Sequence, residues 1–226
     1  MKEGTEKRTA ILFDLDGTLW DSSESVVRSW NEVIEEQPDF DKKGTVEDMY
    51  RLMGKTMDEI AYAFFDTVSP ERALELMQLC SEHENDYIAD HGGKLMPKLK
   101  ETLKELKKDY FLAVVSNCQA GYIEAFLDYH DLRDCFEDYE DFGTTGMKKA
   151  ENIRLVIERN NLDKVCYVGD IQGDMDASTR AGVSFIHAAY GFGKVPDASY
   201  ALESFADLPA LLQTIPEEFF LQKEES

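Results

Sequence analysis

Short apolar runs alternate with amphipathic stretches along most of the chain. Continuous apolar runs of this length are typical of parallel strands buried on both faces. They cover residues 9–13, 111–115, 165–168 and 184–187. Helical spacing of apolar positions predicts helices between and after them. These helices cover residues 98–108, 121–129, 152–160 and 175–181, and Ser204 opens a last one. The repeated order of strand and helix predicts the α/β class, a Rossmann-like open parallel sheet with helices on both faces.

The stretch between the first two predicted strands has a different pattern. Residues 21–93 show helical spacing and no convincing strand alternation. Ser69-Pro70 suits a helix start, with proline at the first helical position, and residues 91–93 (His-Gly-Gly) break the pattern and suit a hinge. We therefore expect an all-helical domain over residues 21–93, inserted into an α/β core made of residues 1–20 and 94–226.

Charge and composition narrow the classes of function. The chain has 226 residues, with 46 acidic and 24 basic side chains and a net charge of −22. Such a surface repels nucleic acids and anionic membranes, so we expect neither as a partner. The residues before the first strand are polar and charged, unlike a signal peptide, and the four cysteines show neither a CxxC pair nor zinc-ligand spacing. We expect a cytoplasmic protein, with monomer and homodimer both open.

Polar residues follow three of the predicted strands at the points where they end. Parallel strands bring these ends to one edge of a sheet, where ligands of α/β proteins bind. The residues are Asp14, Asp16, Ser116, Asn117, Asp170 and Asp174. Four clustered carboxylates repel one another unless a positive group joins them. A divalent cation with oxygen ligands meets that need, and Mg²⁺ suits a site of carboxylates and phosphate. Lys148-Lys149, between the second and third groups, offers a complement for phosphate oxygens.

These motifs resemble those of the haloacid dehalogenase-like (HAD) hydrolase superfamily. The most specific is Asp14-Leu15-Asp16-Gly17-Thr18-Leu19, and the other three follow in the family's order. They are Ser116-Asn117, Lys149 and the segment from Gly169 to Asp174. The helical insert looks like the small cap of the phosphoglycolate-phosphatase-like subgroup. The resemblance therefore implies a phosphoric monoester hydrolase that acts on a small phosphorylated metabolite with Mg²⁺.

The resemblance also implies a role for each residue. Asp14 would attack phosphorus and form an aspartyl-phosphate, and Asp16 would act as general acid and then as general base. Asp14, Asp16 through its backbone carbonyl, and Asp170 would hold the metal, and Asp174 would ligate it or orient its surroundings. Ser116 and Asn117 would hold phosphate oxygens, and Lys149 would neutralise Asp14 and the phosphoryl group.

Two alternatives stay open at this stage. A phosphomutase similar to β-phosphoglucomutase would use the same aspartates, and a non-catalytic protein binding phosphorylated metabolites would share the fold. Dehalogenases and phosphonatases resemble the chain but lack a carboxylate at the position of Asp16. The assignment of the site lysine is uncertain by one position, because Ala150 stands where the family often has proline and Lys148 is adjacent to Lys149. Its spacing to the following helix favours Lys149.

Overall fold

A six-stranded parallel sheet forms the centre of the protein in this computed structural model, which describes residues 9–221. Strand β1 lies in the middle, between β4 and β6, so the three strands that carry the predicted motifs are neighbours. In spatial order the strands are β5 (Asp138–Asp141), β4 (Phe111–Ser116), β1 (Ala10–Phe13), β6 (Val165–Gly169), β7 (Ser184–Ala188) and β8 (Ala201–Leu202). The predicted fold class is confirmed.

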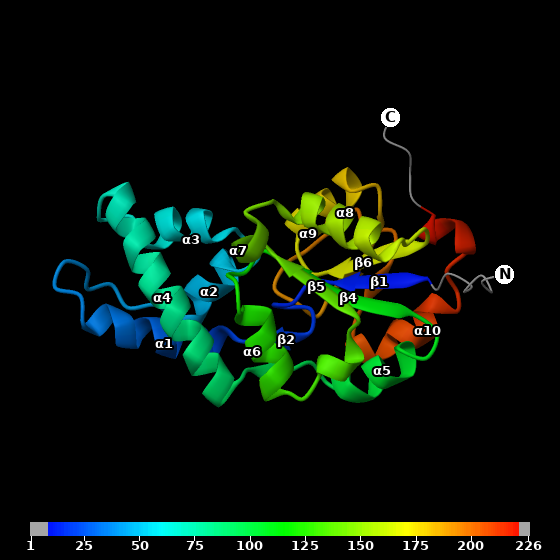
Figure 1. The fold of residues 1–226 in the computed structure, drawn as a ribbon, viewed down its shortest axis with the longest axis horizontal. Coiled ribbons are helices and arrows are strands. Elements are labelled where there is room, and N and C mark those ends of the chain that lie inside the picture. Colours follow the sequence, from blue (N-terminus) through cyan, green and yellow to red (C-terminus); the bar gives the residue numbers. More distant parts are fainter. Residues whose placement is uncertain (1–8, 222–226) are drawn as a thin grey trace.

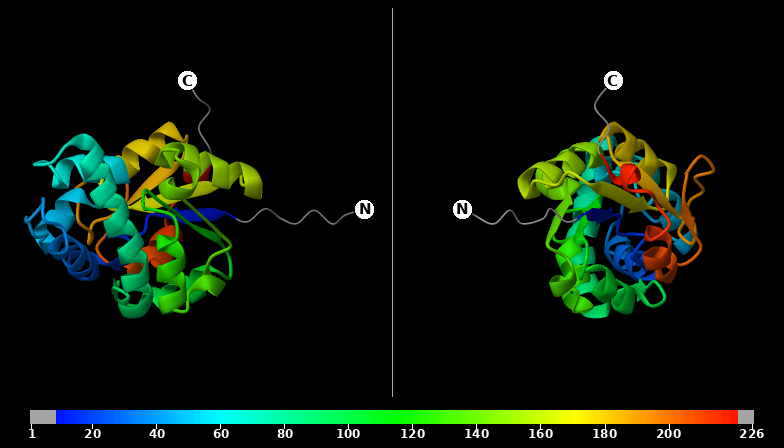
Figure 2. Two further views of the ribbon diagram at one scale, coloured as in Figure 1. Left: turned by 60° about the vertical axis from the view of Figure 1, so that its left-hand side comes forward. Right: turned by 90° about the vertical axis from the view of Figure 1, so that its right-hand side faces the viewer.

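Helices cover both faces of this sheet (Figure 1; Figure 2). One face packs on α5 (Leu99–Leu106), α6 (Tyr122–Tyr129) and α10 (Leu208–Leu212). The other packs on α8 (Lys149–Asn160) and α9 (Gln172–Arg180). Successive strand residues supply the two cores in turn, as the alternation of side chains along a strand requires. The remaining short elements are α7 (Phe142–Thr145) and 3₁₀ turns at Arg133–Cys135, Phe205–Asp207 and Glu217–Phe220.

Four helices lie together beyond the carboxyl ends of the strands, at the left of Figure 1. They are α1 (Ser23–Glu35), α2 (Val46–Leu52), α3 (Met57–Phe64) and α4 (Pro70–His91). Strand β2 (Trp20–Asp21), where the chain leaves the core, pairs antiparallel with β3 (Lys94–Leu95), where it returns. We call the four helices and their loops the cap. The bounds of the cap, residues 21–93, stay a prediction.

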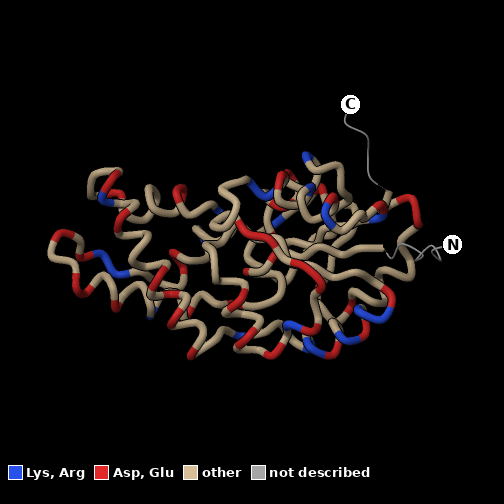
Figure 3. Tube along the Cα trace, viewed as in Figure 1, with Lys and Arg blue, Asp and Glu red and all other residues tan. Residues whose placement is uncertain are grey.

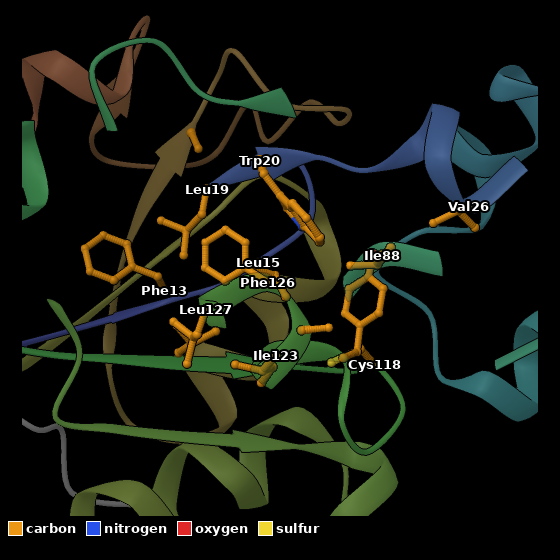
Figure 4. Close-up of a cluster of buried hydrophobic side chains, with 14 of the residues drawn as sticks. Phe13, Leu15, Leu19, Trp20, Val26, Ile88, Cys118, Ile123, Phe126 and Leu127 are labelled. Carbon is orange, nitrogen blue, oxygen red and sulfur yellow. The ribbon is translucent and has the colours of Figure 1, made fainter. Parts of the chain in front are cut away.

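The buried core continues from the sheet into the cap. Figure 4 shows Phe13 and Leu15 packed near Phe126, and Ile88 of α4 joins the same cluster. Inside the cap, Trp30 packs edge-on against Phe64 at a ring-centroid distance of 5.4 Å. Burial of such aromatic side chains gives a small helical unit most of its stability. Sheet and cap are therefore joined by apolar packing as well as by the chain.

Strand β5 was not among the predicted strands, and its composition explains the omission. It reads Asp-Tyr-Glu-Asp, which lacks the apolar run of a buried strand. Arg159 compensates part of this charge, since its guanidinium lies 2.6 Å from Asp138 and 2.5 Å from Glu140. Helices α8 and α9 also begin three residues earlier than predicted, so that Lys149 and Asp174 lie in first helical turns.

The distribution of charge matches the composition. Figure 3 shows acidic residues over both the cap and the core, with fewer basic ones among them. All four cysteines are unpaired and buried. Within residues 9–221, none of the helices combines the length and the apolar character needed to span a membrane.

Candidate active site

Asp14 lies directly at the carboxyl end of the central strand. Its N–H donates to the carbonyl oxygen of Val168 at 2.8 Å, which continues the β1–β6 pairing by one residue. The chain then turns at Gly17, whose φ of +79° favours glycine. A Cβ atom there would lie 2.3 Å from Asp170 Oδ2. Gly17 therefore permits both the turn and the close approach of Asp170 to Asp14.

Three buried carboxylates and one lysine form the centre of the site. Oxygen atoms of Asp14, Asp170 and Asp174 lie within 4.8 Å of one another. Lys149 Nζ donates to Asp14 Oδ1 at 2.7 Å and to Asp174 Oδ1 at 2.5 Å. Lys148 is exposed, so the structure places Lys149 at this centre. The cluster carries three potential negative charges against one positive charge, an arrangement that attracts a cation.

The pKa values in this cluster reflect that imbalance. Burial, and then the charge of Asp174, raise the pKa of Asp14 to about 7, although Lys149 acts in the opposite direction. Burial and the charges of Asp174 and Asp14 raise the pKa of Asp170 to about 8. Burial alone would lower the pKa of Lys149, but Asp14 and Asp174 hold it well above its usual value. In the absence of a bound cation, Asp14 and Asp170 are thus held partly protonated at neutral pH.

Asp174 differs from the other two aspartates because both of its oxygens have protein donors. Oδ1 accepts from Lys149, and Oδ2 accepts from the backbone N–H groups of Asp170 and Ile171 at 3.0 and 3.2 Å. Asp170 Oδ2 accepts from the backbone N–H of Phe192 at 2.7 Å. Asp174 thus fixes both the lysine and the loop that presents Asp170.

A second network holds Asp16. Its Oδ1 atom accepts from Trp20 Nε1 at 2.9 Å, Ser22 Oγ at 2.7 Å and Tyr122 Oη at 3.0 Å. Burial raises the pKa of Asp16 to about 6, and these hydrogen bonds limit the rise. A carboxyl group with this pKa can be protonated in one step and ionised in the next near neutral pH.

Asp14 and Asp16 open into a cavity of about 50 Å³ between the core and the cap. Ser116 and Asn117, at the end of β4, line the same cavity. The side chain of Asn117 donates to the carbonyl oxygen of Gly54 in the cap at 2.9 Å, and its Oδ1 atom is buried with no partner among the described residues. The cavity therefore joins a polar end on the core to a wall supplied by the cap.

All seven residues predicted from the motifs thus lie around one centre at the carboxyl edge of the sheet. The residues that the motifs did not indicate are those that support it, namely Trp20, Ser22, Tyr122, Asn152 and Phe192. Asn152 is fully buried and accepts from Thr145 Oγ1 at 2.9 Å, which secures the loop before Lys149. Its place one turn after Lys149 is the only sequence signal for such a role.

The fold is a Rossmann-like α/β fold with a buried acidic centre at the carboxyl edge of its sheet, and comparison with known proteins gives the family. Residues 11–188 match the family described as haloacid dehalogenase-like hydrolase. The chain is 29% identical to the phosphoglycolate phosphatase of Vibrio vulnificus in an alignment of 198 positions, and the match covers 80% of this chain and 84% of that protein. It is 29% identical to the phosphoglycolate phosphatase of Aquifex aeolicus in an alignment of 221 positions, and the match covers 92% of this chain and 99% of that protein.

A solved structure agrees with these sequence relatives. The crystal structure of a haloacid dehalogenase-like hydrolase from Bacteroides fragilis has a TM-score of 0.77 at 25% identity, and the match covers 89% of this chain and 100% of that one. The chain belongs to the haloacid dehalogenase-like hydrolase family. It is an enzyme of this hydrolase class and is similar to its phosphatases, so the predicted family is confirmed.

Proposed function

We propose that the protein is a magnesium-dependent phosphatase that hydrolyses small phosphate monoesters through an aspartyl-phosphate at Asp14. The observation that carries the proposal is the contact of a buried aspartate with a buried lysine at the mouth of a cavity. Asp14 and Lys149 are 2% and 3% exposed, and their charged atoms are 2.7 Å apart. The similarity to phosphoglycolate phosphatases supports the same reaction class.

The donor set fits a divalent cation. Asp14 and Asp170 present carboxylate oxygens to one point, and hard cations such as Mg²⁺ prefer such ligands. We assign the metal to Asp14, Asp170 and the backbone carbonyl of Asp16, and Asp174 to the orientation of Lys149 and the Asp170 loop. A bound magnesium ion would neutralise carboxylate and phosphoryl charge during the transfer.

The protein's own residues account for the proton and phosphoryl movements. One carboxylate oxygen of Asp14 forms a bond to phosphorus while the ester P–O bond breaks, and protonated Asp16 gives its proton to the departing alcohol oxygen. Asp16 then takes a proton from water, whose oxygen attacks phosphorus and releases Asp14 and inorganic phosphate. The phosphoryl oxygens are bound by Ser116 and Asn117, and their charge is neutralised by Lys149. This positioning and charge neutralisation lower the barrier to phosphoryl transfer.

The test is phosphate release from acetyl phosphate and 4-nitrophenyl phosphate in the presence of magnesium. Asp14→Asn should abolish release, because an amide is a poor nucleophile, and mass spectrometry should detect a phosphorylated wild-type protein only. Asp176→Asn, the same change at an exposed position of α9, is the matched control. Equal rates for wild type and Asp14→Asn would refute the mechanism. With a hexose 1-phosphate, an isomerised sugar phosphate without free phosphate would indicate the phosphomutase.

A further inference from the structure

The wall of the cavity that faces the phosphate end is almost entirely apolar. Side chains from α1, α2, α3 and the loop between α2 and α3 form it. They are Val26, Trp30, Met49, Leu52, Met53, Met57 and Ile60. In a phosphatase the leaving group must occupy the space next to the phosphoryl group, so this wall and its few polar groups contact the leaving group. The polar groups there decide which leaving groups fit.

Glu84 of α4 is the buried charged group on this wall. It is 4% exposed, and its carboxylate accepts hydrogen bonds from Gln119 Nε2 at 2.9 Å and from Trp30 Nε1. Gln119 lies three positions after Ser116, and Glu84, Gln119 and Ser116 line the same cavity. The backbone around it is fixed, because Asn85 Nδ2 donates to the carbonyl oxygen of Ala120 at 2.8 Å.

The charge of Glu84 has no cationic partner among residues 9–221 with which it forms an ion pair; both of its hydrogen-bond donors are neutral. Burial raises the pKa of Glu84 to about 7, so the carboxylate is ionised in mildly alkaline solution. The cap also contributes Lys55 to the cavity lining, but Lys55 is exposed. A buried charge acts through a lower effective dielectric than an exposed one, so Glu84 acts on the leaving group more strongly than Lys55 does. Asp16, which lines the same cavity, adds negative charge there and contributes to the raised pKa of Glu84.

We infer that Glu84 selects leaving groups without negative charge, so that the enzyme prefers monoesters of small hydroxylated or amino alcohols to monoesters of hydroxy acids. This inference rests on the proposed phosphatase function and names its substrate class. A leaving-group carboxylate would face the carboxylate of Glu84 across a small apolar cavity, where like charges repel strongly. A hydroxyl or ammonium group would instead donate a charge-assisted hydrogen bond to Glu84.

The experiment compares three compact substrates of similar size at about pH 8, where Glu84 is ionised. They are phosphoglycolate with an anionic leaving group, 2-hydroxyethyl phosphate with a neutral one and phosphoethanolamine with a cationic one. For wild type, kcat/KM should be lowest for phosphoglycolate, by about 10- to 100-fold as expected for like charges in partly screened surroundings. Glu84→Gln should remove most of that gap by raising kcat/KM for phosphoglycolate. Glu82→Gln, the same change at an exposed position of α4, should leave the ranking unchanged.

The outcomes separate this inference from the proposed function. Acetyl phosphate presents an uncharged acetyl group to the cavity, so its hydrolysis reports the phosphatase chemistry without the charge against which Glu84 would discriminate. Turnover of acetyl phosphate together with a wild-type preference for phosphoglycolate would overturn the selectivity and leave the phosphatase function standing. No turnover of acetyl phosphate with magnesium would overturn both. The wild-type ranking requires no variant, so the inference stays falsifiable even if Glu84→Gln does not fold.

Discussion

Replacing Lys149 with methionine removes the ammonium group that contacts Asp14 and Asp174 while keeping a side chain of similar length. In the native protein Nζ lies 2.7 Å from Asp14 and 2.5 Å from Asp174, and the lysine is 3% exposed. Removal of one partner from a buried ion pair costs about 3–5 kcal/mol, because the other charge stays buried without compensation. We expect a loss of that size in the free energy of unfolding without divalent metal.

Magnesium should reverse part of this loss. In the variant the cation meets the same carboxylates without repulsion from the ammonium group, so it should raise the free energy of unfolding more than it does in wild type. Catalysis should not recover, since in the proposed mechanism Lys149 also neutralises the developing phosphoryl charge. We expect phosphate release to fall by about 10²–10³-fold, as for other groups that stabilise transition-state charge.

Urea unfolding followed by tryptophan fluorescence, with EDTA or with magnesium, measures both stabilities. Lys148→Met is the matched control, and because Lys148 is exposed it should change the free energy of unfolding by less than about 0.5 kcal/mol. If Lys149→Met unfolded at the wild-type urea concentration in EDTA, or if magnesium stabilised both proteins equally, the electrostatic account of this centre would be wrong.

Three further predictions follow from the same contacts. The metal-free protein should become more stable as pH falls from about 7 toward 3.8, because the raised pKa of Asp14 makes the folded state bind a proton that the unfolded state releases. Urea unfolding in EDTA at several pH values measures this dependence. A free energy of unfolding that rises with pH through this window would contradict the prediction. Tyr122→Phe removes one donor that orients Asp16, so kcat/KM for alkyl phosphates, which covers the steps through transfer to Asp14, should fall by about 3- to 30-fold. For 4-nitrophenyl phosphate, whose leaving group needs no proton, kcat/KM should be nearly unaffected; an equal fall for both substrates would argue against the role of Asp16 as acid. Gly17→Ala places a Cβ atom 2.3 Å from Asp170 Oδ2 at a φ of +79°. Phosphate release should therefore be lost, and magnesium should no longer raise the melting temperature. Wild-type values of both would show that the loop can relax.

The central part of the fold and the site follows from local patterns in the sequence. The apolar runs before Asp14, Ser116 and Asp170 predict buried parallel strands, and the rule that such strands share one carboxyl edge brings the three polar groups together. Their adjacency in the sheet, with β1 between β4 and β6, agrees with that reasoning. The site could be predicted because its residues are adjacent to strong strand signals.

The residues that support the site could not be predicted in this way, because their roles depend on contacts over long sequence distances. Tyr122 reaches Asp16 across 106 positions, and Arg159 neutralises Asp138 across 21. Glu84 lies on a helix whose charged residues look like an ordinary solvated face until α4 is packed against the loop after β4. These side chains interact strongly because they are buried. The sequence does not predict burial for single polar residues.

The two aspartates of the first motif are held by different parts of the molecule, although they are two positions apart. Asp14 is fixed to the sheet through Val168 and to the acidic centre through Lys149. Asp16 is fixed by Trp20 of β2 and by Ser22, at the point where the chain enters the cap. The proposed nucleophile is thus held by the core, whereas the proposed proton donor is held by residues at the base of the cap together with Tyr122 of α6. In the proposed mechanism, a movement of the base of the cap on substrate binding would therefore also move the residues that orient Asp16, which would tie recognition of the leaving group to its protonation.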